Sequence, residues 1–188
     1  MKMIETNLPG VCIIEPKVLC DPRGFFVEFY NQRTFAHLGI DYTFVQDNHS
    51  RSSRAVVRGL HYQLPHPQAK LIRVIVGEAY DVALDLRQGS PTFGQWTGLV
   101  LSAANMRMLL IPEGFAHGFC VVSETAEFTY KCSDFYAPGD EKGVIWNDPA
   151  LAIPWPLGDD KPIVSPKDAA YGTLATRPSK DLPIWKAG

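Results

Sequence analysis

Glycine and proline divide this chain into short apolar stretches, and that spacing constrains the fold more than any other feature. The 15 glycines and 15 prolines recur between β-branched and aromatic runs instead of collecting in one linker. Runs of strand length occupy residues 11–19, 25–30, 55–63, 70–76, 79–86, 96–102, 107–111, 119–122 and 127–132. Several of them alternate apolar with polar residues, as half-buried strands do. The pattern predicts an all-β fold, either a sandwich or a barrel.

Local signals predict one short helix and two tight turns. The stretch from Asn31 to Leu38 has helical character, and Gly39 follows it in the place of a common C-cap residue. The sequence Asp21-Pro-Arg-Gly24 has proline where a type I or type II turn accepts it. Gly77-Glu78 separates two candidate strands as a tight hairpin connection would. We therefore expect one helix, one type I or type II turn and one hairpin connection at these positions.

Spaced prolines distinguish the C-terminal part of the chain. They stand at Pro154, Pro156, Pro162, Pro166, Pro178 and Pro183. Each removes a backbone donor from a possible sheet, which favours an extended segment wrapped over the strands. With 188 residues, the chain is long enough for one sizeable core and short for two. We expect a single domain with a core over about residues 3–150 and a wrapping segment over about 151–188.

Composition argues against several classes of protein. Eighteen basic and 20 acidic residues give a formal net charge of −2 without a basic block, so no nucleic-acid partner is expected. The N-terminal stretch lacks the layout of a secretion signal, and no apolar run approaches the roughly 18 residues of a membrane helix. The cysteines, Cys12, Cys20, Cys120 and Cys132, have no CxxC spacing. Free thiols in a reducing cytoplasm are the expectation.

Two histidines have unusual neighbours. His61 lies in Arg58-Gly-Leu-His-Tyr-Gln63, and His117 lies in Ile111-Pro-Glu-Gly-Phe-Ala-His-Gly118. On a regular strand, Gly59, His61 and Gln63 share one face. A face made of small and polar residues has the composition of a cavity wall. The structural alternative is an imidazole buried with one hydrogen bond made. The pattern alone leaves both interpretations open.

Lys70 and Tyr130 stand on rows of apolar residues. Lys70 has the strand parity of Ile72 and Val74, and Tyr130 has that of Phe128. Such a lysine lies at the solvated end of its strand or is buried for a purpose, and an inward tyrosine is most often a core residue with its hydroxyl capped. The strand pattern leaves both roles open.

The acidic residues and arginines carry weaker signals. Asp81 and Asp85 alternate with apolar residues, which usually marks a solvated sheet face without a chemical role. Arg23 and Arg58 could bind an anionic ligand, although scattered arginines are normally surface residues. Asp168 is a lone carboxylate in the proline-rich tail.

A metal site is a competing interpretation, because two histidines on different strands of a barrel are part of a common ligand set. The sequence His61-Tyr-Gln63 has no second histidine two residues on and no glutamate a few residues later. Three or four ligands are hard to assemble from this pattern, so no functional metal is expected.

One set of motifs runs in order from about residue 3 to residue 170. Its members are Asp21-Pro-Arg-Gly-Phe-Phe26, Gln46-Asp-Asn-His-Ser50, Arg58-Gly-Leu-His-Tyr-Gln63, Lys70-Leu-Ile-Arg73, Ile111-Pro-Glu-Gly-Phe-Ala-His-Gly-Phe119, Tyr130-Lys131, Tyr136-Ala-Pro-Gly139, Glu141 and Ser165-Pro-Lys-Asp168. The set resembles the dTDP-4-dehydrorhamnose 3,5-epimerase family. The resemblance implies a cupin-type jelly-roll barrel, usually a homodimer, that uses no metal or organic cofactor. It also implies epimerisation at C3 and C5 of dTDP-4-dehydro-6-deoxy-D-glucose, giving dTDP-4-dehydro-L-rhamnose for dTDP-L-rhamnose biosynthesis.

The resemblance assigns roles residue by residue. It implies His61 as the base, Asp168 as its carboxylate partner and Tyr130 as the acid that returns a proton. It places Lys70 near the C4 oxygen and His117 elsewhere in the active site. The family's nucleotide-sugar contacts fall on Arg23, Glu28, Gln46, Asp47, Asn48, Arg58, Glu141 and Lys167, with Phe26 and Tyr136 as neighbours of the base or sugar.

The reaction explains why such a set is needed. A C4 ketone acidifies the hydrogens on C3 and C5, since the carbanion delocalises onto the carbonyl oxygen without an external electron sink. An imidazole titrates near neutral pH and suits the base, a cation stabilises the enolate oxygen, and inversion needs a second titratable group on the opposite face. The forked donors of arginine suit the diphosphate.

Some alternatives stay open at this level. Epimerases that act only at C3 or only at C5 carry the same pattern. A metal-dependent cupin enzyme and a non-catalytic sugar-nucleotide-binding protein are further alternatives.

Arg58 and His61 differ by three positions and would face opposite sides of a regular strand, unless Gly59 introduces a bulge or Arg58 serves a partner subunit. Ala55 stands where the family is expected to have glycine, which affects only a local turn.

Overall fold

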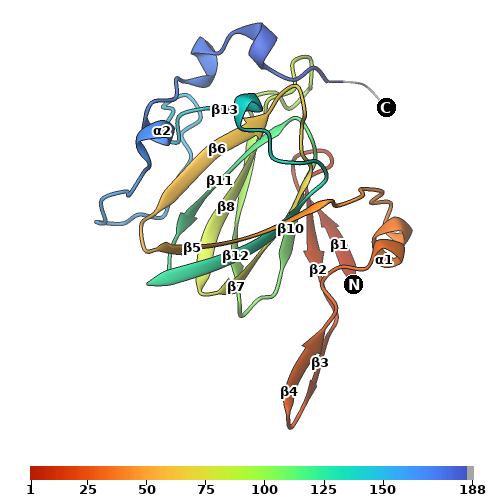
Figure 1. Ribbon diagram of the computed structural model, residues 1–188. Coiled ribbons are helices and arrows are strands. Elements are labelled where there is room, and N and C mark those ends of the chain that lie inside the picture. Colours follow the sequence, from red (N-terminus) through yellow and green to blue (C-terminus); the bar gives the residue numbers. More distant parts are fainter. Residues whose placement is uncertain (186–188) are drawn as a thin grey trace.

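Two antiparallel β-sheets face each other in the computed structural model, which describes residues 1–185 (Figure 1). The first is six-stranded, in the order β1-β2-β10-β7-β12-β5, and the second is five-stranded, in the order β13-β6-β11-β8-β9. A two-stranded hairpin, β3-β4, stands apart from both. The chain is therefore all-β, and its jelly-roll arrangement of the cupin type agrees with the resemblance, although the two sheets do not join into a closed barrel within the described part.

The strands take these bounds in the chain. The first sheet contains β1 (Lys2–Glu5), β2 (Cys12–Glu15), β5 (Gln46–Ser53), β7 (Lys70–Val76), β10 (Met108–Ile111) and β12 (Thr125–Cys132). The second contains β6 (Val57–Gln63), β8 (Glu78–Asp85), β9 (Trp96–Ser102), β11 (Phe115–Val121) and β13 (Glu141–Gly143). The hairpin is β3 (Val18–Asp21) and β4 (Gly24–Val27). Helical elements are short, namely α1 (Gln32–His37), α2 (Pro166–Ala169), η1 (Pro138–Asp140), η2 (Leu174–Thr176) and η3 (Ser179–Asp181).

The main core lies between the two sheets. Its fully buried members include Ile72 on β7, Leu109 on β10, Phe128 on β12 and Ala83 on β8. Phe119 on β11 crosses the gap and stacks on Phe128 with ring centroids 4.0 Å apart. Because the apolar side chains concentrate in one part of this interlayer space, the polar inward side chains of β5, β6, β7 and β12 can line a cavity elsewhere in it.

The helix and the first hairpin confirm the local predictions. The Asn31 side chain caps α1 by accepting hydrogen bonds from the backbone N–H groups of Arg33 and Thr34, and Gly39 follows with φ of +79°. In the β3-β4 hairpin, Asp21 pairs with Gly24 and accepts a hydrogen bond from the Arg23 N–H at 2.8 Å. Both features were specified by residues within a few positions of each other.

Several strand predictions were incomplete. Residues 11–19 divide into β2 and β3, residues 25–30 yield only β4, and β11 begins at Phe115, four residues before the predicted start. The sequence pattern did not indicate β1, β5 or β13. Strand β5 has the polar sequence QDNHSRSS, because one of its faces borders the cavity and the other is largely exposed, so it carries no apolar alternation.

The predicted hairpin at Gly77-Glu78 is wrong. Strand β7 belongs to the six-stranded sheet and β8 to the five-stranded sheet, so the chain crosses from one layer to the other at Gly77. Gly77 has φ of +71°, and a Cβ there would lie 2.0 Å from the Thr125 carbonyl oxygen. The glycine therefore serves a close approach at the crossing, which a short turn signal cannot distinguish from a hairpin.

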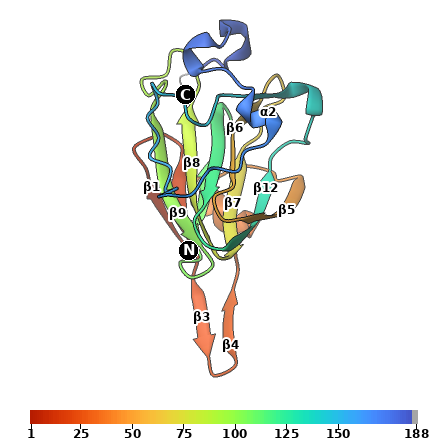
Figure 2. The ribbon, with the colours of Figure 1, turned by 90° about the vertical axis from the view of Figure 1, so that its left-hand side faces the viewer.

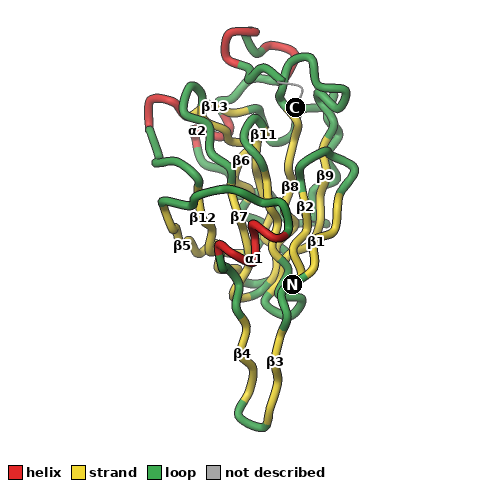
Figure 3. The backbone as a smooth tube through the Cα atoms, turned by 90° about the vertical axis from the view of Figure 1, so that its right-hand side faces the viewer, coloured by secondary structure: helices red, strands yellow, loops and turns green. Residues whose placement is uncertain are grey.

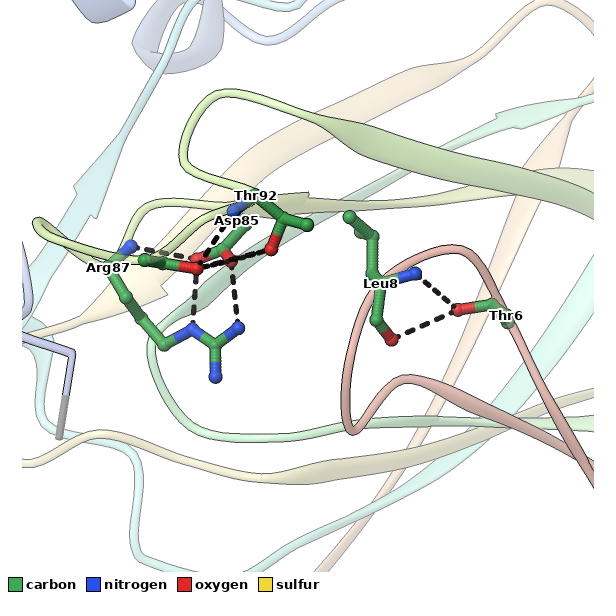
Figure 4. Close-up of polar contacts among 6 residues, drawn as sticks. Thr6, Leu8, Asp85, Arg87 and Thr92 are labelled. Carbon is green, nitrogen blue, oxygen red and sulfur yellow. Dashed lines mark hydrogen bonds and ion pairs between the residues drawn. The ribbon is translucent and has the colours of Figure 1, made fainter. Parts of the chain in front are cut away.

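The expectation that Asp81 and Asp85 lie on a solvated face is also wrong, since both are 0% exposed. Strand β8 is interior to its sheet, and its two faces are both covered. Asp85 accepts hydrogen bonds from the Arg87 guanidinium at 2.9 and 2.8 Å, from Ser90 and from Thr92 (Figure 4). Full satisfaction by these donors explains how a buried carboxylate is tolerated.

The C-terminal segment covers the outer face of the five-stranded sheet (Figure 2). Leu151 and Leu182 pack with Leu60, Val82 and Leu84, which point outward from β6 and β8. Backbone bonds fasten the segment to the start of β6, with Ile163 N–H donating to Ala55 and Val57 N–H donating to Ile163. Within residues 1–185, no helix is long and apolar enough to cross a membrane.

Candidate active site

Four of the predicted catalytic side chains line one cavity between the sheets. His61 on β6, Lys70 on β7 and Tyr130 on β12 border both of its adjoining compartments. The outer compartment is also lined by Gln46, Asn48, Gln63, Tyr136 and Glu141, and the inner one by Ser50, Arg58 and His117. An imidazole, an ammonium and a phenol from three different strands therefore share one solvent-accessible space.

A carboxylate fixes the His61 ring. The Nε2 atom of His61 lies 2.7 Å from Asp168 Oδ1, and the other Asp168 oxygen accepts the Gly59 N–H at 3.2 Å. Asp168 is 3% exposed and lies on α2, which Ser165 caps by accepting the Asp168 N–H at 3.1 Å. Burial alone would raise the pKa of Asp168, but its hydrogen bonds and the charge of His61 hold it below its usual range. The pair leaves the second imidazole nitrogen of His61 available.

A second histidine–carboxylate pair lies beside the first. His117 on β11 is the direct cross-strand neighbour of His61, and its Nε2 lies 3.0 and 3.1 Å from the two oxygens of Asp81. Asp81 points inward from β8 and is fully buried. The sequence analysis missed this carboxylate because the outward face of β8 is the apolar one, which reverses the usual meaning of its alternation.

Lys70 and Tyr130 lie in partly desolvated positions. Burial lowers the pKa of Lys70, while the nearby Cys132, Glu141 and Asp81 oppose that shift. Burial raises the pKa of Tyr130, so its hydroxyl keeps its proton at neutral pH. Lys70 lies on the same face of β7 as Ile72, and Tyr130 lies on the same face of β12 as Phe128. Both side chains border the cavity, so neither is an ordinary core residue.

The rim of the cavity carries a polar cluster around Glu141 on β13. The Lys167 ammonium pairs with Glu141, and the Tyr136 hydroxyl donates to it at 2.6 Å. Burial would raise the pKa of Glu141, but Lys167, Tyr136 and His61 together lower it. Tyr171 donates to the same carboxylate at 3.4 Å, and its ring packs edge to face with that of His61, with centroids 5.9 Å apart. Glu141, Lys167 and Tyr136 were predicted, whereas no sequence signal indicated Tyr171.

A β-bulge resolves the parity conflict between Arg58 and His61. On β11, His117 pairs with His61 and Phe119 pairs with Arg58, so three steps on β6 oppose two steps on β11. Gly59 has φ of +118°, and a Cβ there would lie 2.5 Å from the Gly118 Cα. Arg58 and His61 consequently border the same inner compartment. Ala55, which stands where glycine was expected, has φ of +60° in the turn before β6.

The Gln46–Asn48 stretch of β5 is divided between two faces. Gln46 and Asn48 point into the cavity, where Gln46 Nε2 donates to Asn48 Oδ1 at 3.0 Å. Asp47 points to the other face, where it pairs with Lys131 at 2.8 Å and borders a neighbouring groove under Phe29 and Tyr30. Its side chain is therefore not brought to His61 in this chain.

Three predicted binding residues do not line the cavity of the same chain. Arg23 and Phe26 stand on the β3-β4 hairpin, which projects from the body at the end opposite the C-terminal segment (Figure 3). The Arg23 side chain is 90% exposed and Phe26 is 69% exposed. Glu28 follows the hairpin and accepts a hydrogen bond from Asn31 at 3.1 Å. One chain alone does not bring these residues to His61.

The donor set does not fit a metal ion. Over residues 1–185, no group of three or more His, Cys, Asp or Glu side chains converges as ligands would. All four cysteines are free.

Comparisons with known proteins bear on this site. A family model described as dTDP-4-dehydrorhamnose 3,5-epimerase matches residues 5–176. The dTDP-4-dehydrorhamnose 3,5-epimerase of Pseudomonas aeruginosa is 57% identical over 169 residues, covering 89% of this chain and 93% of the relative. That of Neisseria gonorrhoeae is 55% identical over 93% of this chain, which spans 53% of the longer relative.

A solved structure is similar over nearly the whole chain. The dTDP-6-deoxy-D-glucose-3,5-epimerase of Legionella pneumophila Philadelphia 1, in complex with dTDP-4-keto-L-rhamnose, superposes with a TM-score of 0.96 at 50% identity and covers 99% of each chain. The jelly roll and its acid–base cavity thus fall in the class of nucleotide-sugar isomerases. The chain belongs to the dTDP-4-dehydrorhamnose 3,5-epimerase family, as its motifs predicted.

Proposed function

We propose that the chain epimerises dTDP-4-dehydro-6-deoxy-D-glucose at C3 and C5, giving dTDP-4-dehydro-L-rhamnose for dTDP-L-rhamnose biosynthesis. The observation that carries the proposal is the convergence of His61, Lys70 and Tyr130 on one cavity. The family membership and the relatives' names support the substrate, a dTDP-linked 4-keto-6-deoxyhexose. The side chains of the cavity supply a base, an acid and a cation, which is the set that a proton-transfer isomerisation needs.

His61 begins the reaction as the general base. The imidazole nitrogen opposite Asp168 takes the proton from C3 or C5, and the C–H electron pair moves into the enolate, whose charge gathers on O4. Asp168 fixes the ring orientation and stabilises the imidazolium that forms, because its own lowered pKa keeps it ionised. The adjacent pair of His117 and Asp81 supports the same wall of the cavity.

Lys70 and Tyr130 complete the cycle. The Lys70 ammonium stands beside O4 and stabilises the enolate more than the ketone, since negative charge grows there in the transition state. Tyr130 returns a proton to the opposite face of the ring, which inverts the carbon, and its raised pKa keeps the hydroxyl protonated for that step. The tyrosinate recovers its proton from solvent while the imidazolium releases one, so no external electron acceptor enters the balance.

The remaining polar residues hold the nucleotide part. Arg58 at the inner compartment faces the diphosphate, and Glu141, Lys167 and Tyr136 at the rim contact the sugar or the base. Binding energy from these remote groups orients the sugar ring between His61 and Tyr130.

Incubation of the 4-keto sugar nucleotide in D₂O tests the reaction and its regiochemistry together. The proposal predicts deuterium at both C3 and C5 in the product, read by NMR. Deuterium at one carbon alone would replace it with a single-site epimerase. No incorporation, together with tight dTDP binding, would replace it with a sugar-nucleotide-binding protein. Loss of activity on removing a stoichiometric metal would favour a metal-dependent cupin enzyme.

The projecting hairpin supports a homodimer as the working unit. Arg23 and Phe26 are exposed on it, and the family resemblance assigns both to the nucleotide sugar. The hairpin projects away from β6, β7 and β12, the strands that carry His61, Lys70 and Tyr130 (Figure 1), so these two residues serve the cavity of a second copy of the chain. The four free thiols support a reducing, cytoplasmic location for this enzyme.

Mixing two inactive variants tests this exchange. Arg23→Ala lacks the hairpin cation, and His61→Asn lacks the base. If the hairpin serves the partner, a mixed dimer contains one site with both wild-type residues, and co-refolding the variants restores part of the activity. A mixture as inactive as its components, with mixed dimers demonstrated by mass, would place Arg23 in its own chain's site.

A further inference from the structure

Gln63 belongs to the motif of His61, yet neither proton transfer nor substrate contact accounts for it. The side chain is 6% exposed and ends at the main chain of two loops, the one before β7 and the one before β13. Its Nε2 donates to the carbonyl oxygens of His66 at 2.9 Å and Phe135 at 3.2 Å, and its Oε1 accepts the Ala137 N–H at 2.9 Å. Both amide protons are therefore used, and none is left for a substrate atom.

Two of these bonds, those to Phe135 and Ala137, end on residues 135–137, which we call the Tyr136 segment. Gln46 adds a further bond by accepting the Tyr136 N–H at 2.9 Å. Two glutamine side chains from different strands thus hold three successive residues of a segment without regular secondary structure. The Tyr136 ring, 49% exposed, leans over the cavity mouth with its hydroxyl on Glu141.

Other contacts join the surrounding loops without touching the Tyr136 segment. Gln68 donates to the Asp134 carbonyl at 2.7 Å, and Ala69 and Ser133 exchange hydrogen bonds at 2.8 and 3.0 Å. Leu64 N–H donates to the Asp140 carbonyl at 3.1 Å. Loss of the Gln63 amide would therefore leave the loops attached at both ends and remove two of the hydrogen bonds that hold the segment between them, so that Tyr136 is held less firmly.

We propose that Gln63 is a positioning residue that holds Tyr136 at the mouth of the cavity and thereby sets the affinity for the dTDP part of the substrate. The inference rests on the proposed function, since it takes Tyr136 to contact the nucleotide sugar. Gln63 acts on binding and not on proton transfer, because its amide touches only main-chain atoms and is bonded to neither His61 nor Tyr130. Gln46, which the resemblance places at the nucleotide sugar, also helps to position Tyr136, because its Oε1 accepts the Tyr136 N–H.

The test is Gln63→Met, which keeps the length of the side chain and removes its hydrogen bonds. We expect KM for the 4-keto sugar nucleotide and Kd for dTDP, measured by calorimetry, to rise about tenfold, which corresponds to about 1.4 kcal/mol. We expect kcat to stay within twofold. In a Tyr136→Ala background the same substitution should change KM by less than twofold, because the ring that it positions is already gone.

Gln88→Met is the matched control. The Gln88 amide also donates to two backbone carbonyls, those of Ser179 at 2.8 Å and Leu182 at 3.1 Å, but it does not line the cavity and is not bonded to the Tyr136 segment. It should leave KM and Kd unchanged. Should Gln63→Met fail to fold, Gln63→Glu retains the acceptor for Ala137 N–H, loses both donors and should raise KM in the same direction.

Several outcomes would overturn the proposal. They are a wild-type dTDP affinity in the folded Gln63 variant, a fall in kcat at unchanged KM, and effects of Gln63→Met and Tyr136→Ala that multiply in the double variant. Failure of the proposed function would look different, because the wild-type protein would not convert the sugar nucleotide, while the dTDP affinities of the variants would still decide the role of Gln63.

Discussion

Replacing Asp168 by asparagine isolates the charge beside the proposed base. The carboxylate lies 2.7 Å from His61 Nε2, accepts the Gly59 N–H at 3.2 Å and is 3% exposed. The substituted amide would keep the size of the side chain and one oxygen for the Gly59 N–H. It would lose the negative charge that faces the imidazolium when His61 takes a proton. The substitution therefore perturbs the transition state with little change in packing.

The size of the effect follows from the bond that is lost. Hydrogen bonds to charged groups contribute about 1.5 to 3 kcal/mol, and each 1.36 kcal/mol is tenfold in rate. We therefore expect Asp168→Asn to lower kcat/KM roughly 10- to 150-fold. Since the imidazolium forms only as the proton is removed, the loss should fall on kcat more than on KM.

The assay is the initial rate of deuterium incorporation at C3 and C5, followed by NMR at saturating and limiting substrate. Asp160→Asn is the control, because Asp160 is an exposed acid of the same C-terminal segment whose partner is Arg54 at 2.7 Å. It should react within twofold of the wild type. A near-normal rate for Asp168→Asn, or a change in KM alone, would refute the assignment of Asp168 as partner of the base.

Three further predictions concern packing and pH. Gly143→Ala places a Cβ 2.3 Å from the Tyr171 ring, so the ring must move out of its contact with His61. We expect kcat/KM to fall about fivefold. Adding Tyr171→Ala should cause no further loss, because the contact is already broken. Asp85→Asn removes the negative charge that pairs with the Arg87 guanidinium and should lower the free energy of unfolding in urea by about 3 kcal/mol. Burial raises the pKa of Asp85, but Arg87 and the hydroxyl donors outweigh it and lower the pKa overall. The contribution of Asp85 to the free energy of unfolding should therefore be fully present above the ordinary aspartate pKa of about 3.9 and decline below it, so the difference between the wild type and Asp85→Asn should shrink as the pH falls through that range.

Local signals predicted those parts of the fold whose determinants lie close together in sequence. The Asn31 cap and Gly39 bound α1, and the Asp21–Gly24 turn closes the first hairpin. Strand β5 was missed because a cavity wall needs polar residues where a core strand has apolar ones. The crossing at Gly77 was mistaken for a hairpin, since a glycine between two strands does not reveal which sheet each strand joins.

The site residues likewise differ in whether the local sequence could predict them. The face shared by His61 and Gln63 suggested a cavity wall from parity alone, and both residues border the cavity. Asp168 joins His61 from 107 positions away, a pairing that only the family resemblance could indicate. Asp81 was read as solvated because alternation shows that two faces differ, but not which of them the second layer and the C-terminal segment cover.

Solvent exchange in two variants tests most directly whether His61 and Tyr130 act on opposite faces of the sugar ring. In D₂O, Tyr130→Phe should still let His61 remove and return a proton on one face, so recovered substrate gains deuterium without forming the epimer. His61→Asn should give neither deuterium nor epimer. Normal epimerisation by Tyr130→Phe, or exchange that survives the loss of His61, would contradict the two-sided mechanism.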